Sequence, residues 1–430
     1  MTALFRLAIG PKVSDRSSLD EPLDAARGAW LGGGAARSIL VSCALIASVV
    51  LLVSQAITVN QVLGDIDTPL VTDLDRDLLG AEAVNRGLQP YTTLGELKPD
   101  LPTEWAQTWV AHSPVSIVMA RVAGVIGDRS QIVALNRWVS LIALLGLVWF
   151  LIRLRSRNRL LLLAAFTVVV WAPTISDLRW VQAQGLIALG LAAVLTLYTK
   201  SQRWWALTLL GVLVAWKPWL AFLALFLPGS SSPWRDASRV GIVSIGLTMA
   251  VLPWAGGWDA LRAWLFEAMP TNTELSRQLH TGVLSFTADV SLPIATTIYV
   301  ASVIVAVVLG RRTLGPQVWP ALGALTHLAY GPLVWDHYWL AVLPVVCWPL
   351  IGGTREPLVR WSLAGWLVLS ALSHHLYSAF DWPGWVSNVP LAFLASVPVG
   401  LGGLWLTALR RSRNELSPNE AQAVSLAAPG

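Results

Sequence analysis

The feature that most constrains this chain is a run of 21 residues without a charge, ILVSCALIASVVLLVSQAITV, at positions 39 to 59. Such a run is long enough to cross the roughly 30 Å hydrocarbon core of a bilayer as one helix. Similar apolar segments recur along the 430 residues, of which 55% are hydrophobic and only 13% charged. A soluble domain of this size does not tolerate that composition on its surface. The sequence therefore predicts an all-α protein that crosses a membrane many times.

Basic clusters between the apolar segments indicate where the chain returns to the cytoplasm, because cytoplasmic loops are enriched in Lys and Arg. Placing every such cluster inside predicts about 12 transmembrane helices, with both termini in the cytoplasm. The expected spans are 39 to 59, 131 to 152, 160 to 175, 181 to 199, 204 to 217, 218 to 229, 238 to 255, 291 to 310, 316 to 335, 338 to 352, 358 to 374 and 388 to 409. With 20 of the 30 basic and 8 of the 25 acidic residues inside, the net charge is +12 inside and −7 outside.

The expected organisation is a cytoplasmic segment at 1 to 38, a transmembrane domain at 39 to 409 and a disordered cytoplasmic tail at 410 to 430. Polar residues precede the first span and no small-residue cleavage site follows it, so we expect it to be retained rather than removed as a signal peptide. The largest outer loop is 60 to 130. Within it, the short apolar segment 113 to 127 contains a charge, and we interpret it as an interfacial or re-entrant helix.

One lysine lies within an apolar segment. In LLGVLVAWKPWLAFLALFL, Pro218 lacks an amide proton and disfavours helix at Lys217, so the segment is expected to turn there as two short helices. Lys217 then lies at the outer turn of a hairpin. A lysine in that position is costly unless its charge meets an anion. We expect it to meet an anion, which the family resemblance described below implies to be a phosphate; the alternatives are an ion pair with an acidic residue or an ammonium that extends to the membrane interface.

Three aspartates lie in the predicted outer loop that follows the first span. The stretch TDLDRDLLGAEAVNRGLQPY places Asp73, Asp75 and Asp77 at every second position of the outer loop. A carboxylate at a membrane surface, with its pKa tuned by charged neighbours and partial burial, can act as a general base. Alternatively, the aspartates form a solvated loop or cap the helix that follows, where carboxylates are stabilised.

Five segments, in order, resemble glycosyltransferase family 87, whose members have the GT-C membrane fold. They are DLDRDLLGAEAVNRGLQPY, SPVSIVMARVAG, QAQGLIALGL, LLGVLVAWKPWLAFLALFL and GPLVWDHYWLAVLP, and the similarity runs from about 39 to 352. Members of the family include mannosyltransferases and arabinofuranosyltransferases that build cell-envelope glycans in mycobacteria and their relatives. They take the sugar from a polyprenyl phosphate and act on the outer face of the plasma membrane.

The resemblance implies a GT-C bundle and a role for several residues. Asp73 holds the family's position relative to Gly87 and Tyr91 and is therefore the expected base, with Asp75 or Asp77 as alternatives. It would take the proton of an acceptor hydroxyl that attacks the anomeric carbon from the face opposite the phosphate. His337, beside Asp336, matches the family's Trp-x-His segment. It is expected to hydrogen-bond the leaving phosphate or the sugar, unless it belongs to an interfacial aromatic belt.

Further polar residues map to the outer side. Arg179 is a candidate for a bidentate phosphate contact, and Asp177 is an equally good partner for it. Asp75, His112 and His280 are candidates for contacts to substrate, although each histidine alone is more often structural. The family resemblance implies no metal, so no metal or other cofactor is expected. The polyprenyl-phosphate sugar is a substrate, and the expected partners are that donor, a glycolipid or cell-wall glycan acceptor and membrane lipids, with no nucleic acid.

Two alternatives to a mannosyltransferase remain at this stage. An arabinofuranosyltransferase that uses polyprenyl-phosphate arabinofuranose fits the same residues, and mannose is favoured only because more of the family uses it. A carrier or flippase for a lipid-linked sugar belongs to a different class of protein. A carrier predicts charged groups near the bilayer midplane and repeated halves, whereas here the charges collect on one side.

Overall fold

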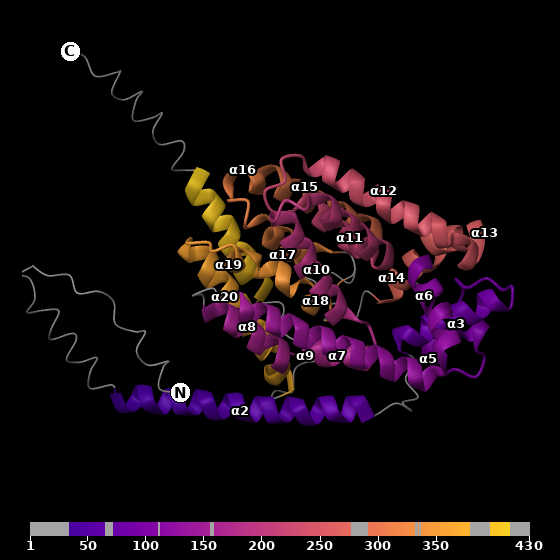
Figure 1. The fold of residues 1–430 in the computed structure, drawn as a ribbon, viewed down its shortest axis with the longest axis horizontal. Coiled ribbons are helices and arrows are strands. Elements are labelled where there is room, and N and C mark those ends of the chain that lie inside the picture. Colours follow the sequence, from indigo (N-terminus) through magenta and orange to yellow (C-terminus); the bar gives the residue numbers. More distant parts are fainter. Residues whose placement is uncertain are drawn as a thin grey trace, which may run out of the picture. The chain divides into compact units, whose positions relative to one another are not determined.

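The computed structural model describes residues 34–64, 72–110, 112–154, 159–276, 291–331, 334, 337–378 and 396–412 (Figure 1). These residues form helices and turns; within them there is no β-strand, and Thr93 and Trp109 form an isolated bridge. The predicted all-α class is therefore confirmed for the described part of the chain. The chain divides into two compact units, Met1–Ala56 and Ile57–Gly430. The predicted segments 1 to 38 and 410 to 430 lie mostly outside the described residues.

The predicted spans coincide with helices, although several are short or broken. The helices are α2 (Gly34–Gly64), α7 (Arg129–Arg153), α8 (Arg159–Val170), α9 (Ala172–Trp180), α10 (Gln184–Thr199), α11 (Arg203–Trp216), the 3-10 helix η3 (Pro218–Leu225), α12 (Pro233–Val251), α15 (Leu292–Val305), α17 (Trp319–Tyr330), α18 (Tyr338–Val346), α19 (Trp348–Ile351), α20 (Pro357–Ser378) and the helix 396–412. The break predicted at Lys217 is present, between α11 and η3, and η3 packs against α11.

Three helices of the described chain are long and apolar enough to cross a membrane: Arg129–Arg153, Pro233–Trp254 and Leu292–Thr313. A bent pair, Arg159–Val170 with Pro173–Trp180, adds a fourth if its halves form a single span. The helices α10 and α11 are apolar but shorter. These lengths are compatible with insertion into a membrane, whereas about 12 spans remains a prediction.

The surfaces of the long helices support the same conclusion. Ile242 and Ile245 on α12 are 70% and 65% exposed, and Ile294 and Val300 on α15 are exposed as well. Runs of exposed aliphatic side chains along a helix are rare on soluble monomers and mark contact with lipid or with another protein. Their placement on helices that meet the length of a membrane span favours lipid as the contact.

The helix α10 packs against α7, α11 and α18 (Figure 1). It is apolar on all sides, as expected for a helix in the middle of a bundle, and Ile187, Leu191 and Leu195 are buried in the main core.

A glycine allows α11 and α12 to pack closely. A Cβ at Gly211 of α11 would lie 2.6 Å from the side chain of Val243 on α12, so a larger residue there would push these helices apart.

A buried polar network joins α10, α11 and α12 at one end. The carboxylate of Asp236 accepts hydrogen bonds from Tyr198 Oη at 2.7 Å, Ser230 Oγ at 2.6 Å and Arg203 Nε at 2.9 Å. Arg203 is the first residue of α11 and Lys217 follows its last, so they lie at opposite ends of one helix, about 20 Å apart. We call the end that holds Lys217 the Lys217 end of the bundle.

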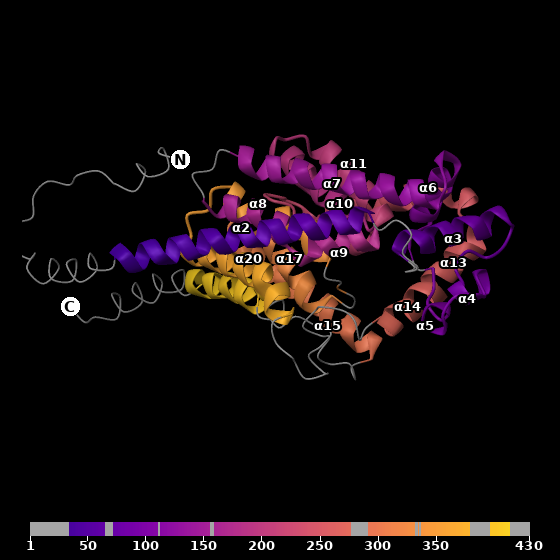
Figure 2. The ribbon, with the colours of Figure 1, turned by 90° about the horizontal axis from the view of Figure 1, so that it is seen from below.

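A small helical layer lies at the Lys217 end. It contains α3 (Asp73–Asn85), α4 (Leu94–Leu97), α5 (Thr103–Ala106), α6 (Pro114–Ile126), η4 (Leu252–Trp254), α13 (Gly257–Ala263), the π-helix η5 (Trp264–Ala268) and α14 (Met269–Ser276). The helices α3, α6 and α13 lie together in Figure 2. Ala81, Ile117 and Ala263 from these helices share a second core. Residues of the predicted outer loop 60 to 130 therefore fold against the segment 260 to 268.

Gly87 ends α3 for a conformational reason. Its φ is +73°, a left-handed conformation that costs a residue with a Cβ but not glycine. The amide of Leu88 donates to the carbonyl of Ala83 at 2.8 Å, and the amide of Gly87 donates to that of Val84 at 3.0 Å. This pair of bonds is the Schellman arrangement, which satisfies the last carbonyls of a helix.

Candidate functional site

The first turn of α3 is held by Asp75. Thr72 caps the helix, and its amide and hydroxyl both donate to Oδ2 of Asp75 at 2.8 Å, which completes a capping box. Arg129, the first residue of α7, donates Nε to Oδ1 at 2.5 Å and Nη2 to Oδ2 at 2.8 Å. The carboxylate thus caps α3 and ties it to α7, as one of the sequence alternatives proposed for these aspartates. A contact between Asp75 and substrate stays a prediction.

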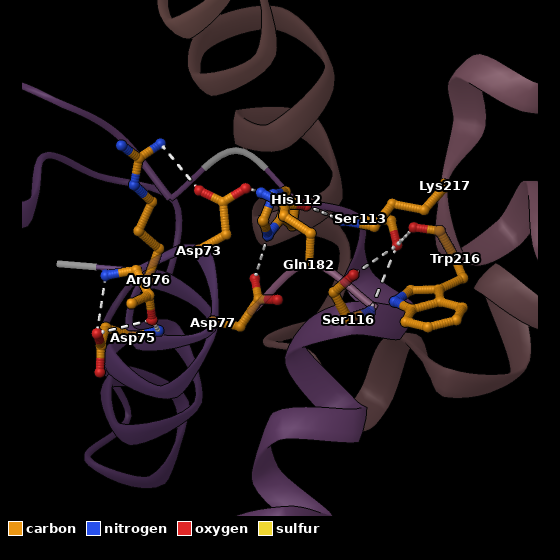
Figure 3. Close-up of polar contacts among 11 residues, drawn as sticks. Asp73, Asp75, Arg76, Asp77, His112, Ser113, Ser116, Gln182, Trp216 and Lys217 are labelled. Carbon is orange, nitrogen blue, oxygen red and sulfur yellow. Dashed lines mark hydrogen bonds and ion pairs between the residues drawn. The ribbon is translucent and has the colours of Figure 1, made fainter. Parts of the chain in front are cut away.

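Asp73 and Asp77 face the same imidazole. Residues four apart lie on one face of a helix, and the ring of His112 lies against that face (Figure 3). Its Nε2 is 3.3 Å from Oδ2 of Asp73, and its Nδ1 is 2.8 Å from Oδ1 of Asp77. Arg76 Nη1 lies 3.8 Å from the other oxygen of Asp73. The side chains of Asp73 and His112 are 19% and 21% exposed, so both are shielded yet reachable from solvent.

The charges around this cluster lower the pKa of Asp73 and raise the pKa of His112. Burial alone would raise the pKa of the Asp73 carboxyl, but His112, Arg76 and Lys217 lower it well below its ordinary value. Burial alone would lower the pKa of His112, but Asp77 and Asp73 outweigh burial and Lys217 and raise it. A proton shared by Asp73 and His112 therefore resides on the imidazole.

Lys217 is buried beside this cluster. Its side chain is 8% exposed, and its Nζ donates to Oε1 of Gln182 at 3.2 Å. Among the described residues, no carboxylate lies within ion-pair distance of Nζ. The ammonium is nevertheless within electrostatic range of Asp73, His112 and Asp177. A buried ammonium with a neutral partner can accept an anion.

A strained turn presents Gln182 to the lysine. Val181 and Ala183 have φ of 58° and 57°, a left-handed conformation that is rare for any residue with a Cβ and unusual for a β-branched one. Asp177 stabilises the turn, because its Oδ1 accepts from the amide of Gln184 at 2.6 Å and its Oδ2 from that of Gly185 at 3.2 Å. Strain of this kind persists where the surrounding structure over-determines it, often at functional sites.

Ser113 holds the two halves of the cluster together. It caps α6, and its Oγ donates to the carbonyl of Trp216 at 2.9 Å, a contact between residues 103 apart in the chain (Figure 3). His112 precedes Ser113 and Lys217 follows Trp216. This hydrogen bond therefore holds the chain segments that carry His112 and Lys217 next to each other.

His337 belongs to the same neighbourhood. It is 4% exposed, and its ring centroid lies 5.1 Å from that of Tyr338. Tyr338 is within electrostatic range of Asp73, and His337 is within range of Asp177. The structure thus gathers four predicted site residues from separate segments: Asp73, His112, Lys217 and His337.

Other predicted site residues are not part of this cluster. Arg179 is exposed on α9, and Asp177, its suggested partner, instead caps α10. Within the described segments, no hydrogen bond or ion pair links Arg179 to the cluster. Asp336 and His280 lie outside the described residues. Over the described ranges no group of three or more His, Cys, Asp or Glu side chains is arranged to hold a metal.

The sequence does not predict the contacts of two members of the cluster, Asp77 and Gln182. Asp77 was considered only as another base, although its spacing of four from Asp73 on a helix predicts a shared face. Gln182 lies within a segment that resembles the family, but no sequence signal marks its contact with Lys217.

Comparison of the chain with protein-family models, with curated proteins and with solved structures finds no match.

The structural role of Asp75 can be tested by measuring the stability of the protein without its carboxylate. Asp75→Ala removes one half of the capping box, an interaction worth about 0.5–2 kcal/mol, together with the bidentate ion pair to Arg129. We expect the Asp75→Ala protein to unfold at lower temperature in detergent, as followed by tryptophan fluorescence. Asp100→Ala, at an exposed position, is the control and should melt like the wild type. An unchanged melting temperature together with lost substrate binding would assign Asp75 to the substrate instead.

Proposed function

We propose that this protein is an inverting membrane glycosyltransferase that takes a sugar, with mannose favoured, from a polyprenyl-phosphate donor. The acceptor is a hydroxyl of a lipid-anchored or cell-wall glycan on the outer face of the plasma membrane. The observation that carries the proposal is the convergence of the Asp73–His112 pair and the buried Lys217 at one end of an apolar helix bundle. The proposal also rests on the resemblance of five segments to glycosyltransferase family 87.

Lys217 supports a donor that carries a single phosphate. A phosphodiester between a polyprenol and a sugar has one negative charge, and one ammonium with a neutral amide partner offers one positive charge. The neighbouring basic groups, Arg76 and His112, already face carboxylates. The bundle surface is apolar enough to contact lipid, so the prenyl chain can remain in the membrane while its phosphate reaches the lysine.

Asp73 supports the transfer step. An acceptor hydroxyl attacks the anomeric carbon, the bond from that carbon to the phosphate breaks, and the phosphate leaves with the electron pair. The leaving phosphate needs no proton, so one base is sufficient for the reaction. Asp73 is the only aspartate of the three that meets both His112 and Arg76 among the described contacts. His337 and Lys217 are both within electrostatic range of Asp177, and the proposed role of His337 is a hydrogen bond to the sugar or the phosphate.

The sidedness of the site belongs to the same proposal. Lys217 and the Arg203–Asp236 network occupy opposite ends of α11. Because the sequence clusters its basic residues at the Arg203 end, that end is proposed to face the cytoplasm. The Lys217 end then faces outward, where family 87 enzymes use their donors.

The role of Asp73 is tested by removing its charge. Asp73→Asn keeps the shape of the side chain but cannot accept the proton, so we expect transfer from a synthetic polyprenyl-phosphate sugar to fall by about 10²- to 10⁴-fold. Asp259→Asn, at an exposed carboxylate of α13, should transfer at the wild-type rate. Near-normal turnover by folded Asp73→Asn protein would show that another group is the base. Sugar that crosses vesicles without bond formation would instead identify a carrier.

The role of Lys217 is tested by donor affinity and by stability together. Lys217→Gln loses a charge-assisted hydrogen bond to phosphate, worth about 1.5–3 kcal/mol, so donor affinity should fall by about ten- to a hundredfold. The melting temperature should hold or rise, because a buried charge without a carboxylate partner is removed. Lys98→Gln, at an exposed position, is the control for the loss of a lysine. Wild-type donor affinity, or a large fall in melting temperature, would make Lys217 a structural residue.

A further inference from the structure

We propose that His112 relays the acceptor's proton from Asp73 to solvent, and that Asp77 is the positioning residue that orients the imidazole for this transfer. The inference deepens the proposed glycosyl transfer and rests on it. It starts from the position of one ring between two carboxylates of the same helix face, with Nε2 3.3 Å from Asp73 and Nδ1 2.8 Å from Asp77.

The transfer depends on the tautomer of the neutral ring. A neutral imidazole has one N–H and one lone pair. The relay requires the neutral tautomer whose N–H is on Nδ1, the nitrogen with the shorter contact, where it donates to Asp77; the lone pair of Nε2 then faces Asp73. Asp77 therefore acts on Asp73 through the ring, since it determines which nitrogen can accept a proton.

The proton then has a continuous path. As the acceptor oxygen bonds to the anomeric carbon and the phosphate leaves with its electron pair, the hydroxyl proton passes to the Asp73 carboxylate. From there it moves to Nε2 of His112, which becomes an imidazolium between two carboxylates. The ring is 21% exposed, so the proton can next be released to water, and the pair returns to its starting state with no other reactant.

The surrounding charges decide when the relay can operate. His112 faces Asp73 and Asp77 on α3 and Lys217 at the break between α11 and η3, and Arg76 lies behind Asp73. Because these carboxylates raise the pKa of His112, the ring is protonated at low pH and cannot accept a further proton. Activity should therefore rise with pH as the ring becomes neutral. The lowered pKa of Asp73 excludes that carboxyl as the source of a transition near neutral pH.

The pH dependence of kcat/KM reports the ionisation of groups in the free enzyme and is the main test. In the wild type, activity should rise through a transition above pH 6.5, the ordinary value for histidine. Asp77→Asn removes one of the two carboxylates, so its transition should move to lower pH by about one unit. In His112→Gln the transition near neutral pH should disappear and the maximal rate should fall. Glu82→Gln, at an exposed carboxylate on the same helix paired with Arg86, should keep the wild-type profile.

A second readout does not depend on activity. The protein labelled with ¹⁵N-histidine in detergent reports each imidazole by NMR, and the signal lost in His112→Gln identifies His112. Its titration should shift to lower pH in Asp77→Asn and stay in place in Glu82→Gln. An unmoved NMR titration, an unmoved activity transition in Asp77→Asn, or activity that falls as pH rises through this range would overturn the relay. An inactive wild type at every pH would overturn the proposed function itself, while the NMR titration still decides whether Asp77 controls His112.

Discussion

The site depends on a buried positive charge that, among the described residues, has no carboxylate within ion-pair distance. Lys217 is 8% exposed and is bonded to the amide oxygen of Gln182. Burying an ammonium is costly, and an amide oxygen offsets the cost only in part. In the proposed function, an anionic ligand supplies the remaining stabilisation. The same cation also acts on the carboxylate and the histidine that are proposed to handle the proton.

Helix ends, rather than helix faces, assemble this arrangement. Lys217 lies at a break that Pro218 forces, His112 precedes the cap of α6, and Gln182 lies in a strained turn before α10. Each of these positions has backbone groups that the helices leave unsatisfied, and the bond from Ser113 to the carbonyl of Trp216 uses one of them. The other ends of α10, α11 and α12 are fastened by the buried carboxylate of Asp236. The bundle is thus fixed at one end, and the polar groups of the candidate site collect at the other.

The sequence could predict those features that depend on local chemistry. The helical class follows from the apolar runs, the break at Lys217 from the following proline, and the common face of Asp73 and Asp77 from helical spacing. The sequence could not predict that Arg129 would engage Asp75, because 54 residues separate them and exposed arginines are common. Nor could it predict the turn around Gln182, since valine and alanine give no signal of a left-handed conformation.

These contacts lead to one central claim, that the charge of Lys217 is completed by the phosphate of a lipid-linked sugar. The most direct test is an electron cryomicroscopy structure of the protein with a non-transferable polyprenyl-phosphate sugar analogue. The account predicts density for the phosphate within hydrogen-bond distance of Lys217 Nζ, with the anomeric carbon of the sugar facing Asp73. A phosphate bound elsewhere, with the contact between Lys217 and Gln182 unchanged, would contradict it.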